Sequence, residues 1–172
     1  MVRRIEPVID LSPALAELVV DSRMTGPVAR LFGEPVFLFE DKLNYKAPHV
    51  GLDYGLHQDY KYWTEYTNRL ITVTLYLDDA TPENGCLRLV PGSHRQGLVE
   101  PDSEGRLVAW DIDLDAVDAP GPAGSLVVFS CYTAHHSYTN RSPKGRRAIL
   151  CTYNPASRSE ERRVGKECRS RW

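Results

Sequence analysis

The stretch RLITVTLYL, residues 69–77, gives the strongest strand signal in the chain, because β-branched and aromatic residues fill it. Further strands are predicted on both sides of it. Residues 36–39 and 42–46 should together form one long strand. Shorter strands are expected at residues 55–59, 86–90, 107–112, 125–130, 135–139 and 147–153.

Glycine and proline separate these strands, as at residues 91–92 and 120–124. Many short strands with such turns indicate an all-β core, either a barrel or a cupin-like jelly roll (a double-stranded β-helix). We expect residues 135–139 and 147–153 to form a hairpin. Short N-terminal helices should precede the strands. Ser12-Pro13 reads as an N-cap and first helical position, and Gly26-Pro27 should break the pattern before a second helix ending near Leu31.

His57-Gln58-Asp59 and the later pair His135-His136 are the most informative polar residues. Residues two apart on a strand point to the same side, so His57 and Asp59 could reach one metal ion from a short strand. Two histidines and one carboxylate form the facial triad that binds non-haem Fe(II). A single His-x-Asp is a weak signal among five histidines.

The last residues, 158–172, read RSEERRVGKECRSRW and resemble a translated sequencing adapter. We therefore expect one domain at 1–157, truncated at its C-terminus and possibly at its N-terminus, followed by an artefactual tail. This tail holds six of the 21 Lys and Arg and three of the 23 acidic residues, which leaves a net charge of −5 elsewhere. An acidic body without a basic run argues against a nucleic-acid partner.

The remaining composition predicts a cytoplasmic protein. No apolar signal-peptide core follows Met1, and no apolar run is long enough to cross a membrane. Cys86, Cys131 and Cys151 lack C-x-x-C spacing, so we expect reduced, buried thiols and no thiolate zinc site.

Four segments together resemble the phytanoyl-CoA dioxygenase family of Fe(II)/2-oxoglutarate oxygenases, over roughly residues 28–155. They are KLNYKAP (42–48), HQD with residues 60–63, LDDATPENGCLRLVPGSH (77–94) and HHSYTNRSPKGRRAI (135–149). The resemblance implies that His57, Asp59 and His135 bind iron. The register of Ser137, Asn140 and Arg146 favours His135 over His136, which stands where the family commonly has glycine.

The resemblance also implies roles for other side chains. Arg146 would pair with the distal carboxylate of 2-oxoglutarate, which a planar guanidinium binds bidentately. Its neighbour Arg147 should face solvent. The cosubstrate or substrate would be contacted by Thr72, Asn44 and Lys46, and the substrate mouth would be lined by Tyr60 and Trp63. Ordinary β-formers and core aromatics are the alternative for these positions.

The implied activity is hydroxylation of a C–H bond in a small organic or lipid-like substrate. Oxygen and 2-oxoglutarate would be consumed, with succinate and CO2 as co-products and ascorbate as a possible addition. Because Asp59 is retained, hydroxylation is expected rather than halogenation. The alternatives are a non-catalytic metal-binding barrel and a cupin-type metalloenzyme that does not use 2-oxoglutarate. The sequence indicates neither the substrate nor an oligomeric state.

Overall fold

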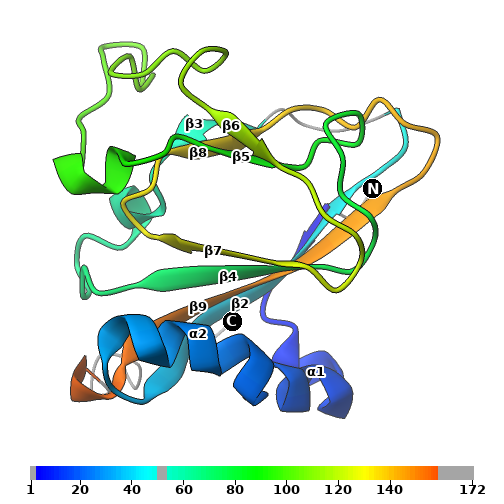
Figure 1. The fold of residues 1–172 in the computed structure, drawn as a ribbon, viewed down its shortest axis with the longest axis vertical. Helices are drawn as coiled ribbons and strands as arrows, with labels where there is room; N and C mark the ends of the chain where they lie inside the picture. The colour runs from blue at the N-terminus through cyan, green and yellow to red at the C-terminus, as the bar shows by residue number, and fades with distance from the viewer. Residues whose placement is uncertain (1–2, 50–53, 159–172) are drawn as a thin grey trace.

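The computed structural model describes residues 3–49 and 54–158, and in them two antiparallel sheets face each other (Figure 1). The five-stranded sheet has the order β1-β2-β9-β4-β7, and the four-stranded sheet the order β3-β8-β5-β6. The first sheet is built from Arg4–Ile5, Val36–Lys46, Arg146–Pro155, Ile71–Tyr76 and Leu126–Ser130 (β1, β2, β9, β4, β7). The second is built from Tyr54–His57, His135–Ser137, Leu87–Leu89 and Val117–Ala119 (β3, β8, β5, β6). The predicted all-β core is confirmed.

The N-terminal helices cover the outer face of the five-stranded sheet (Figure 1). A short 3-10 helix, η1 (Ile9–Leu11), leads into α1 (Pro13–Leu18), and α2 (Ser22–Phe32) follows. Met24 and Val28 of α2 pack against Val73, Ile149 and other alternate sheet residues to form the main apolar core. Since side chains alternate along a strand, the intervening residues of β2, β4 and β9 face the opposite sheet.

Helix α2 differs from its prediction, because it runs through Gly26-Pro27 instead of starting after them. Asp21 caps its N-terminus by accepting a hydrogen bond from the backbone N–H of Arg23. Pro27 cannot donate to the carbonyl four residues earlier, so one helical hydrogen bond is lost. Burial of Met24 and Val28 on either side of the proline favours the helix despite this cost.

Three strand predictions are wrong. Residues 107–112 form turns, in which the Asp111 side chain accepts hydrogen bonds from the backbone of Asp113 and Leu114; the strand β6 lies later. Strands β8 and β9 are not a hairpin, because the connecting loop carries the chain from one sheet to the other. The strand expected at 55–59 ends at His57, and the 3-10 helix η2 (Asp59–Tyr62) begins at Asp59. The single long strand expected at 36–46 is confirmed as β2.

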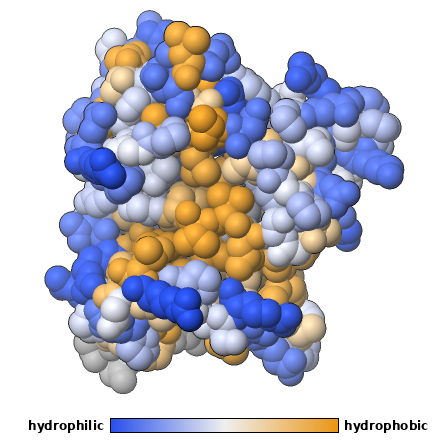
Figure 2. Space-filling view, viewed as in Figure 1, coloured by the Kyte–Doolittle hydropathy of each residue, from blue (hydrophilic) through white to orange (hydrophobic). Residues whose placement is uncertain are grey.

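Apolar side chains gather across the middle of one face of the molecule, over β4 and β7 (Figure 2). Strand β7 is an edge strand of its sheet, and its residues 126–128 are only partly buried.

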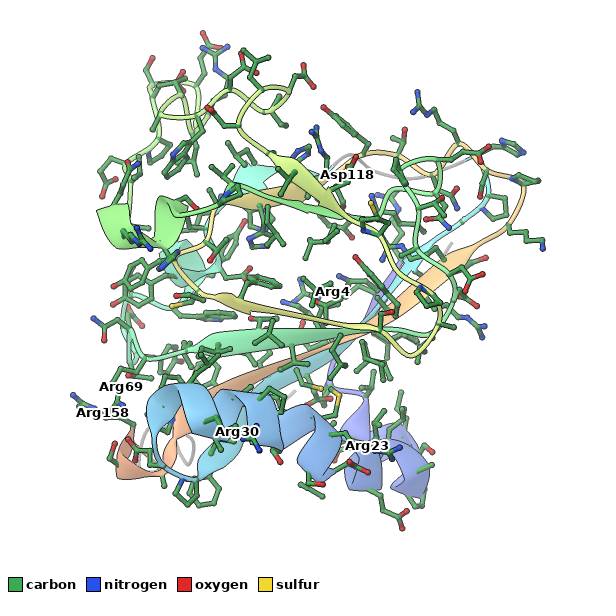
Figure 3. All side chains as sticks on the ribbon, in the orientation of Figure 1. Arg4, Arg23, Arg30, Arg69, Asp118 and Arg158 are labelled. Carbon is green, nitrogen blue, oxygen red and sulfur yellow. The ribbon has the colours of Figure 1, made fainter. Side chains whose placement is uncertain are left out.

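The labelled arginines lie in two different parts of the fold. Figure 3 shows Arg23 and Arg30 on the helical layer, whereas Arg4 extends from β1 between the two sheets.

The predicted buried, unpaired cysteines are confirmed, since Cys86, Cys131 and Cys151 are all buried and free. Among the described residues, no helix is both long and apolar enough to span a bilayer. Arg158 ends the short 3-10 helix η4 (Ala156–Arg158), so it belongs to the described part of the chain. The rest of the segment interpreted as a tail lies outside the described residues, and that interpretation stays a prediction.

Candidate active site

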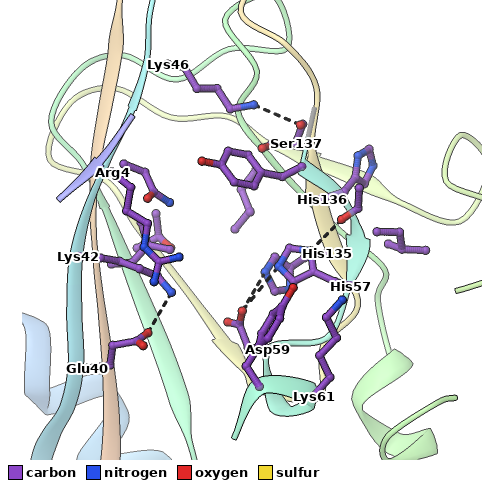
Figure 4. A pocket seen from close by; sticks show the side chains of 18 of the residues that line it. Arg4, Glu40, Lys42, Lys46, His57, Asp59, Lys61, His135, His136 and Ser137 are labelled. Carbon is purple, nitrogen blue, oxygen red and sulfur yellow. Dashed lines mark hydrogen bonds and ion pairs between the residues drawn. The ribbon is translucent and has the colours of Figure 1, made fainter. Parts of the chain in front are cut away.

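A cavity of about 560 Å³ lies between the two sheets (Figure 4). Strand β2 supplies one wall through residues spaced two apart, as the alternation of side chains along a strand requires. These residues are Glu40, Lys42, Asn44 and Lys46. Strands β9 and β4 extend the same wall with Arg146, Leu150, Thr74 and Tyr76. The opposite side carries His57, Asp59 and His135.

His57, Asp59 and His135 form a compact ligand group, in which one donor atom from each lies within 4.8 Å of the others. The Nε2 atoms of His57 and His135 lie 3.6 Å and 3.7 Å from Oδ1 of Asp59. Their ring centroids are 4.2 Å apart. His57 ends β3, His135 begins β8, and the two residues are paired in register. The predicted convergence is present, although Asp59 reaches it from η2 and not from a strand.

Backbone hydrogen bonds fix both imidazoles in the form that a metal requires. Nδ1–H of His57 donates to the carbonyl of Gly55 over 2.8 Å, and Nδ1–H of His135 donates to that of Thr133 over 2.8 Å. Each ring therefore directs its Nε2 toward Asp59. A hydrogen bond from the second ring nitrogen to a carbonyl orients a metal-binding histidine and raises its basicity.

The ionisation of the group also suits a cation. Burial, reinforced by the neighbouring His57, lowers the pKa of His135 to about 4, so its imidazole is neutral at pH 7. Burial alone would raise the pKa of Asp59, but the interactions with His135, His57 and Lys42 outweigh it and bring that pKa below its usual value. Two imidazoles and one carboxylate, held on one side of a cavity, match the donor set of non-haem Fe(II) sites.

Gln58, between the two ligands, is an anchor that the sequence did not single out. The residue is 1% exposed and is not among those that line the cavity. Its amide nitrogen donates to the carbonyls of Gly97 (2.8 Å) and Tyr132 (2.6 Å), and its oxygen accepts from the backbone N–H of Val99 (2.9 Å). Gln58 thus ties the turn between His57 and Asp59 to two other loops.

Arg146 lies at another end of the cavity, with only 5% of its surface exposed. Its guanidinium donates from Nη2 to the carbonyl of Gly85 and lies 5.9 Å from the ring centroid of Tyr76. Its Nε is buried and has no hydrogen-bond acceptor in the described parts of the chain, and no ion pair there involves it. Lys46 is its register partner on β2. A buried cation with an unsatisfied donor fits the carboxylate of an acid such as 2-oxoglutarate.

Asn44 and Thr74 have similar unsatisfied atoms. Oδ1 of Asn44 and Oγ1 of Thr74 are buried and lack hydrogen-bond partners within the described residues, and both side chains line the cavity. Thr72, which was predicted to approach the cosubstrate, is instead hydrogen-bonded to Thr152 over 3.0 Å and is not among the cavity-lining residues. The threonine that faces the cavity is thus two positions later on the same face of β4.

The predicted aromatic pair separates in a similar way. Trp63 is buried and lines the cavity. Tyr60 instead packs on Tyr132, with ring centroids 4.8 Å apart, and does not line the cavity. Tyr62, which the sequence did not suggest, lines the cavity 6.3 Å from the His57 ring. The 3-10 turn of η2 explains the change, because it rotates successive side chains differently from a strand.

The neighbouring histidine and arginine are placed differently from His135 and Arg146. His136 is fully buried, borders the cavity and contacts the ring of Tyr138, but the three-atom ligand group contains His135 instead. Arg147 is exposed, as predicted, and forms an ion pair with Asp78 at 2.7 Å. His94 lies in the 3-10 helix η3 (Ser93–Gln96) and belongs neither to the ligand group nor to the residues that line the cavity.

Gly85 should be required where the chain passes Arg146. Its φ is +71°, and an added Cβ would lie 2.2 Å from the carbonyl oxygen of Tyr138. We predict that Gly85→Ala lowers the melting temperature clearly and weakens 2-oxoglutarate binding, because the carbonyl that holds Arg146 must move. Gly92→Ala is the control, since φ is +79° there but nothing lies within 4 Å of the added Cβ. It should cost only about 1–2 kcal/mol of unfolding free energy. Equal melting temperatures for the two variants would contradict the predicted clash.

Comparison with known proteins identifies relatives of the chain. A family profile described as phytanoyl-CoA dioxygenase (PhyH) matches residues 2–148. The methylphosphonate hydroxylase of Gimesia maris is 33% identical over 160 residues, which cover 92% of this chain and 61% of that protein. A 2-aminoethylphosphonate dioxygenase from an uncultured bacterium is 33% identical over 163 residues, with the same two coverages. The chain therefore spans about three fifths of the length of these relatives.

Among solved structures, EctD from S. alaskensis with 2-oxoglutarate and 5-hydroxyectoine superposes with a TM-score of 0.76 and 28% identity. The match covers 91% of this chain and 57% of that one. The same protein is also similar in a form with bound Fe. This likeness confirms the predicted jelly-roll fold.

Proposed function

Because the chain belongs to the phytanoyl-CoA dioxygenase family, we propose that its protein is an Fe(II)- and 2-oxoglutarate-dependent dioxygenase that hydroxylates a C–H bond of a small organic substrate. One oxygen atom of O2 would enter the substrate as a hydroxyl group. The other would enter succinate, which forms with CO2 from 2-oxoglutarate.

A single observation supports this proposal above the others: a two-histidine, one-carboxylate group shares one cavity with a buried arginine that has no carboxylate partner in the described residues. The first element suits Fe(II), and the second suits the distal carboxylate of 2-oxoglutarate. A binding barrel without 2-oxoglutarate would have no use for a buried guanidinium with an unsatisfied Nε.

In this proposal the iron with its cosubstrate supplies the oxidising chemistry, and the protein supplies the geometry. His57, Asp59 and His135 would hold the metal on one side and leave coordination positions open toward the cavity. Arg146 would fix the far end of 2-oxoglutarate, with Lys46 beside it, and Asn44 and Thr74 would offer polar contacts along the same wall. Trp63 and Tyr62 would limit the access of water to the reacting carbon.

The names of the relatives support a small-molecule substrate, since they describe hydroxylation or dioxygenation of methylphosphonate and 2-aminoethylphosphonate. Three free, buried cysteines are compatible with a reducing compartment, so we propose a cytoplasmic location. Molecular oxygen and the substrate would be the partners. Ascorbate would serve only to keep iron reduced.

Succinate formation tests the proposal. Purified chain with Fe(II), 2-oxoglutarate and O2 should release succinate, slowly without substrate and faster with one. Asp59→Ala should abolish that release, whereas Arg147→Ala should retain it, since Arg147 is exposed and paired with Asp78. Succinate release that is unaffected by Asp59→Ala would contradict the proposed function.

A further inference from the structure

We propose that the substrate carries an anionic group and that Lys42 binds it, which makes Lys42 the specificity-determining residue of the cavity. This inference rests on the proposed function, because it assigns one cationic end of the cavity to 2-oxoglutarate and another to the substrate. It follows from how charge is distributed along β2.

The cavity has an excess of positive charge. Among the described residues, its lining includes five cationic side chains (Arg4, Lys42, Lys46, Lys61 and Arg146) and two carboxylates (Glu40 and Asp59). Fe(II), Asp59 and dianionic 2-oxoglutarate would together leave one negative charge, which Arg146 alone offsets. Arg4 is paired with Glu6, and the remaining cations Lys42, Lys46 and Lys61 still outnumber Glu40. A cavity with an excess of positive charge attracts an anion.

The cations of β2 lie at separate places on its inner face. Lys46 is paired in register with Arg146. Lys42 lies four residues before Lys46 on the same strand and is paired with Leu150. Four residues of strand span about 13 Å. A carboxylate held by Arg146 therefore leaves Lys42 available to a second anion, with Asn44 between the two sites.

Lys42 lies close to the metal-binding group. Figure 4 shows its ammonium extending from β2 toward the side of the cavity that carries Asp59 and His135. Lys42, Asp59 and His135 all line this one cavity. A substrate held by Lys42 would thus present its neighbouring carbon atoms close to the iron position, as hydroxylation requires.

The Lys42 ammonium has donors to spare. Its side chain is only 12% exposed, donates to Glu40 over 2.9 Å and lies 5.8 Å from the Trp63 ring centroid. An ammonium has three N–H donors, and one is used within the described residues. Burial raises the pKa of Glu40 above its usual value, Lys42 opposes that rise, and the nearby Glu6 adds to it. A partly buried ammonium with remaining donors favours an anionic oxygen.

Calorimetry on the full chain tests this inference in two stages under anaerobic conditions. The first stage titrates 2-oxoglutarate into the Fe(II)-loaded chain, and a failure to bind would count against the proposed function itself. The second titrates methylphosphonate, acetate or neutral dimethyl sulfone into the complex saturated with 2-oxoglutarate. We expect at least one anion to bind and the neutral sulfone not to bind. The tighter anion identifies a phosphonate or a carboxylate substrate.

Lys42→Met should weaken anion binding at least about tenfold, the size of one charge-assisted hydrogen bond, and leave 2-oxoglutarate affinity unchanged. Lys144→Met is the matched control, because Lys144 is exposed and lies outside the cavity. The double variant Lys42→Met/Glu40→Gln removes both members of the ion pair, so the test still works if an unpaired Glu40 prevents the single variant from folding.

The inference is overturned if no anion binds, if the sulfone binds as well, or if the folded Lys42 variants bind the anion normally. Dependence on Lys61 alone, tested with Lys61→Met, would also overturn it.

Discussion

Replacing His135 by alanine should abolish tight Fe(II) binding, while replacing His136 by alanine should leave it largely intact. His135 directs Nε2 at Asp59 from 3.7 Å, and its other nitrogen is fixed by the carbonyl of Thr133. Loss of a partner outside the ligand set already costs roughly 10- to 100-fold in metal affinity, so loss of a ligand should cost more. Equilibrium titration of the two variants with Fe(II) under anaerobic conditions measures the difference.

His136→Ala is a demanding control, because His136 is fully buried and adjacent in the chain. Both variants create a cavity in β8, so thermal melts without metal should show comparable destabilisation. If His136→Ala loses the metal and His135→Ala keeps it, the register of β8 is displaced by one residue from the structure described above.

Replacing Arg146 by alanine should weaken 2-oxoglutarate binding by roughly a hundredfold to several thousandfold and spare the binding of iron. The expected magnitude follows from the roughly 3–5 kcal/mol lost when one partner of a buried charge pair is removed. Arg146 is buried and has an unsatisfied Nε, and its guanidinium lies 5.9 Å from the Tyr76 ring centroid. Calorimetric titration of 2-oxoglutarate into the iron-loaded variant gives the affinity.

Arg147→Ala provides the matched comparison one residue away. Arg147 faces solvent and pairs with Asp78, so its loss should change 2-oxoglutarate affinity less than about twofold. Arg146→Lys should recover only part of the loss, since an ammonium keeps the charge but not the bidentate geometry. Similar affinities for the two alanine variants would exclude Arg146 from cosubstrate binding.

The sequence predicted the site better than the connections between strands. His57, Asp59 and His135 were expected together and lie together, and Arg146 was expected in their cavity and lines it. These residues belong to short motifs whose spacing constrains the chemistry directly. The two-residue strand periodicity proposed for His57 and Asp59 was nevertheless wrong, because the chain turns into η2 at Asp59.

The errors arise where tertiary packing outweighs local preference. Pro27 remains inside α2 because Met24 and Val28 are buried on the sheet. Residues 107–112 contain apolar side chains that suit a strand. The Asp111 side chain, near the end of this range, instead accepts hydrogen bonds from the backbone of Asp113 and Leu114 and so stabilises a turn. Thr72 and Tyr60 were chosen by motif position, whereas the choice between Thr72 and Thr74 depends on Thr152, which is distant in sequence. No local pattern shows that contact.

The central claim is that one cavity holds iron at His57, Asp59 and His135 and 2-oxoglutarate at Arg146. A crystal structure of the chain with Mn(II), as an oxygen-insensitive substitute for Fe(II), and 2-oxoglutarate tests it most directly. We predict one anomalous peak within direct coordination distance of Nε2 of both histidines and of an oxygen of Asp59, slightly beyond the roughly 2.0–2.2 Å that zinc adopts. We also predict a 2-oxoglutarate carboxylate paired with the Arg146 guanidinium. A metal bound through His136, or 2-oxoglutarate bound away from Arg146, would contradict the claim.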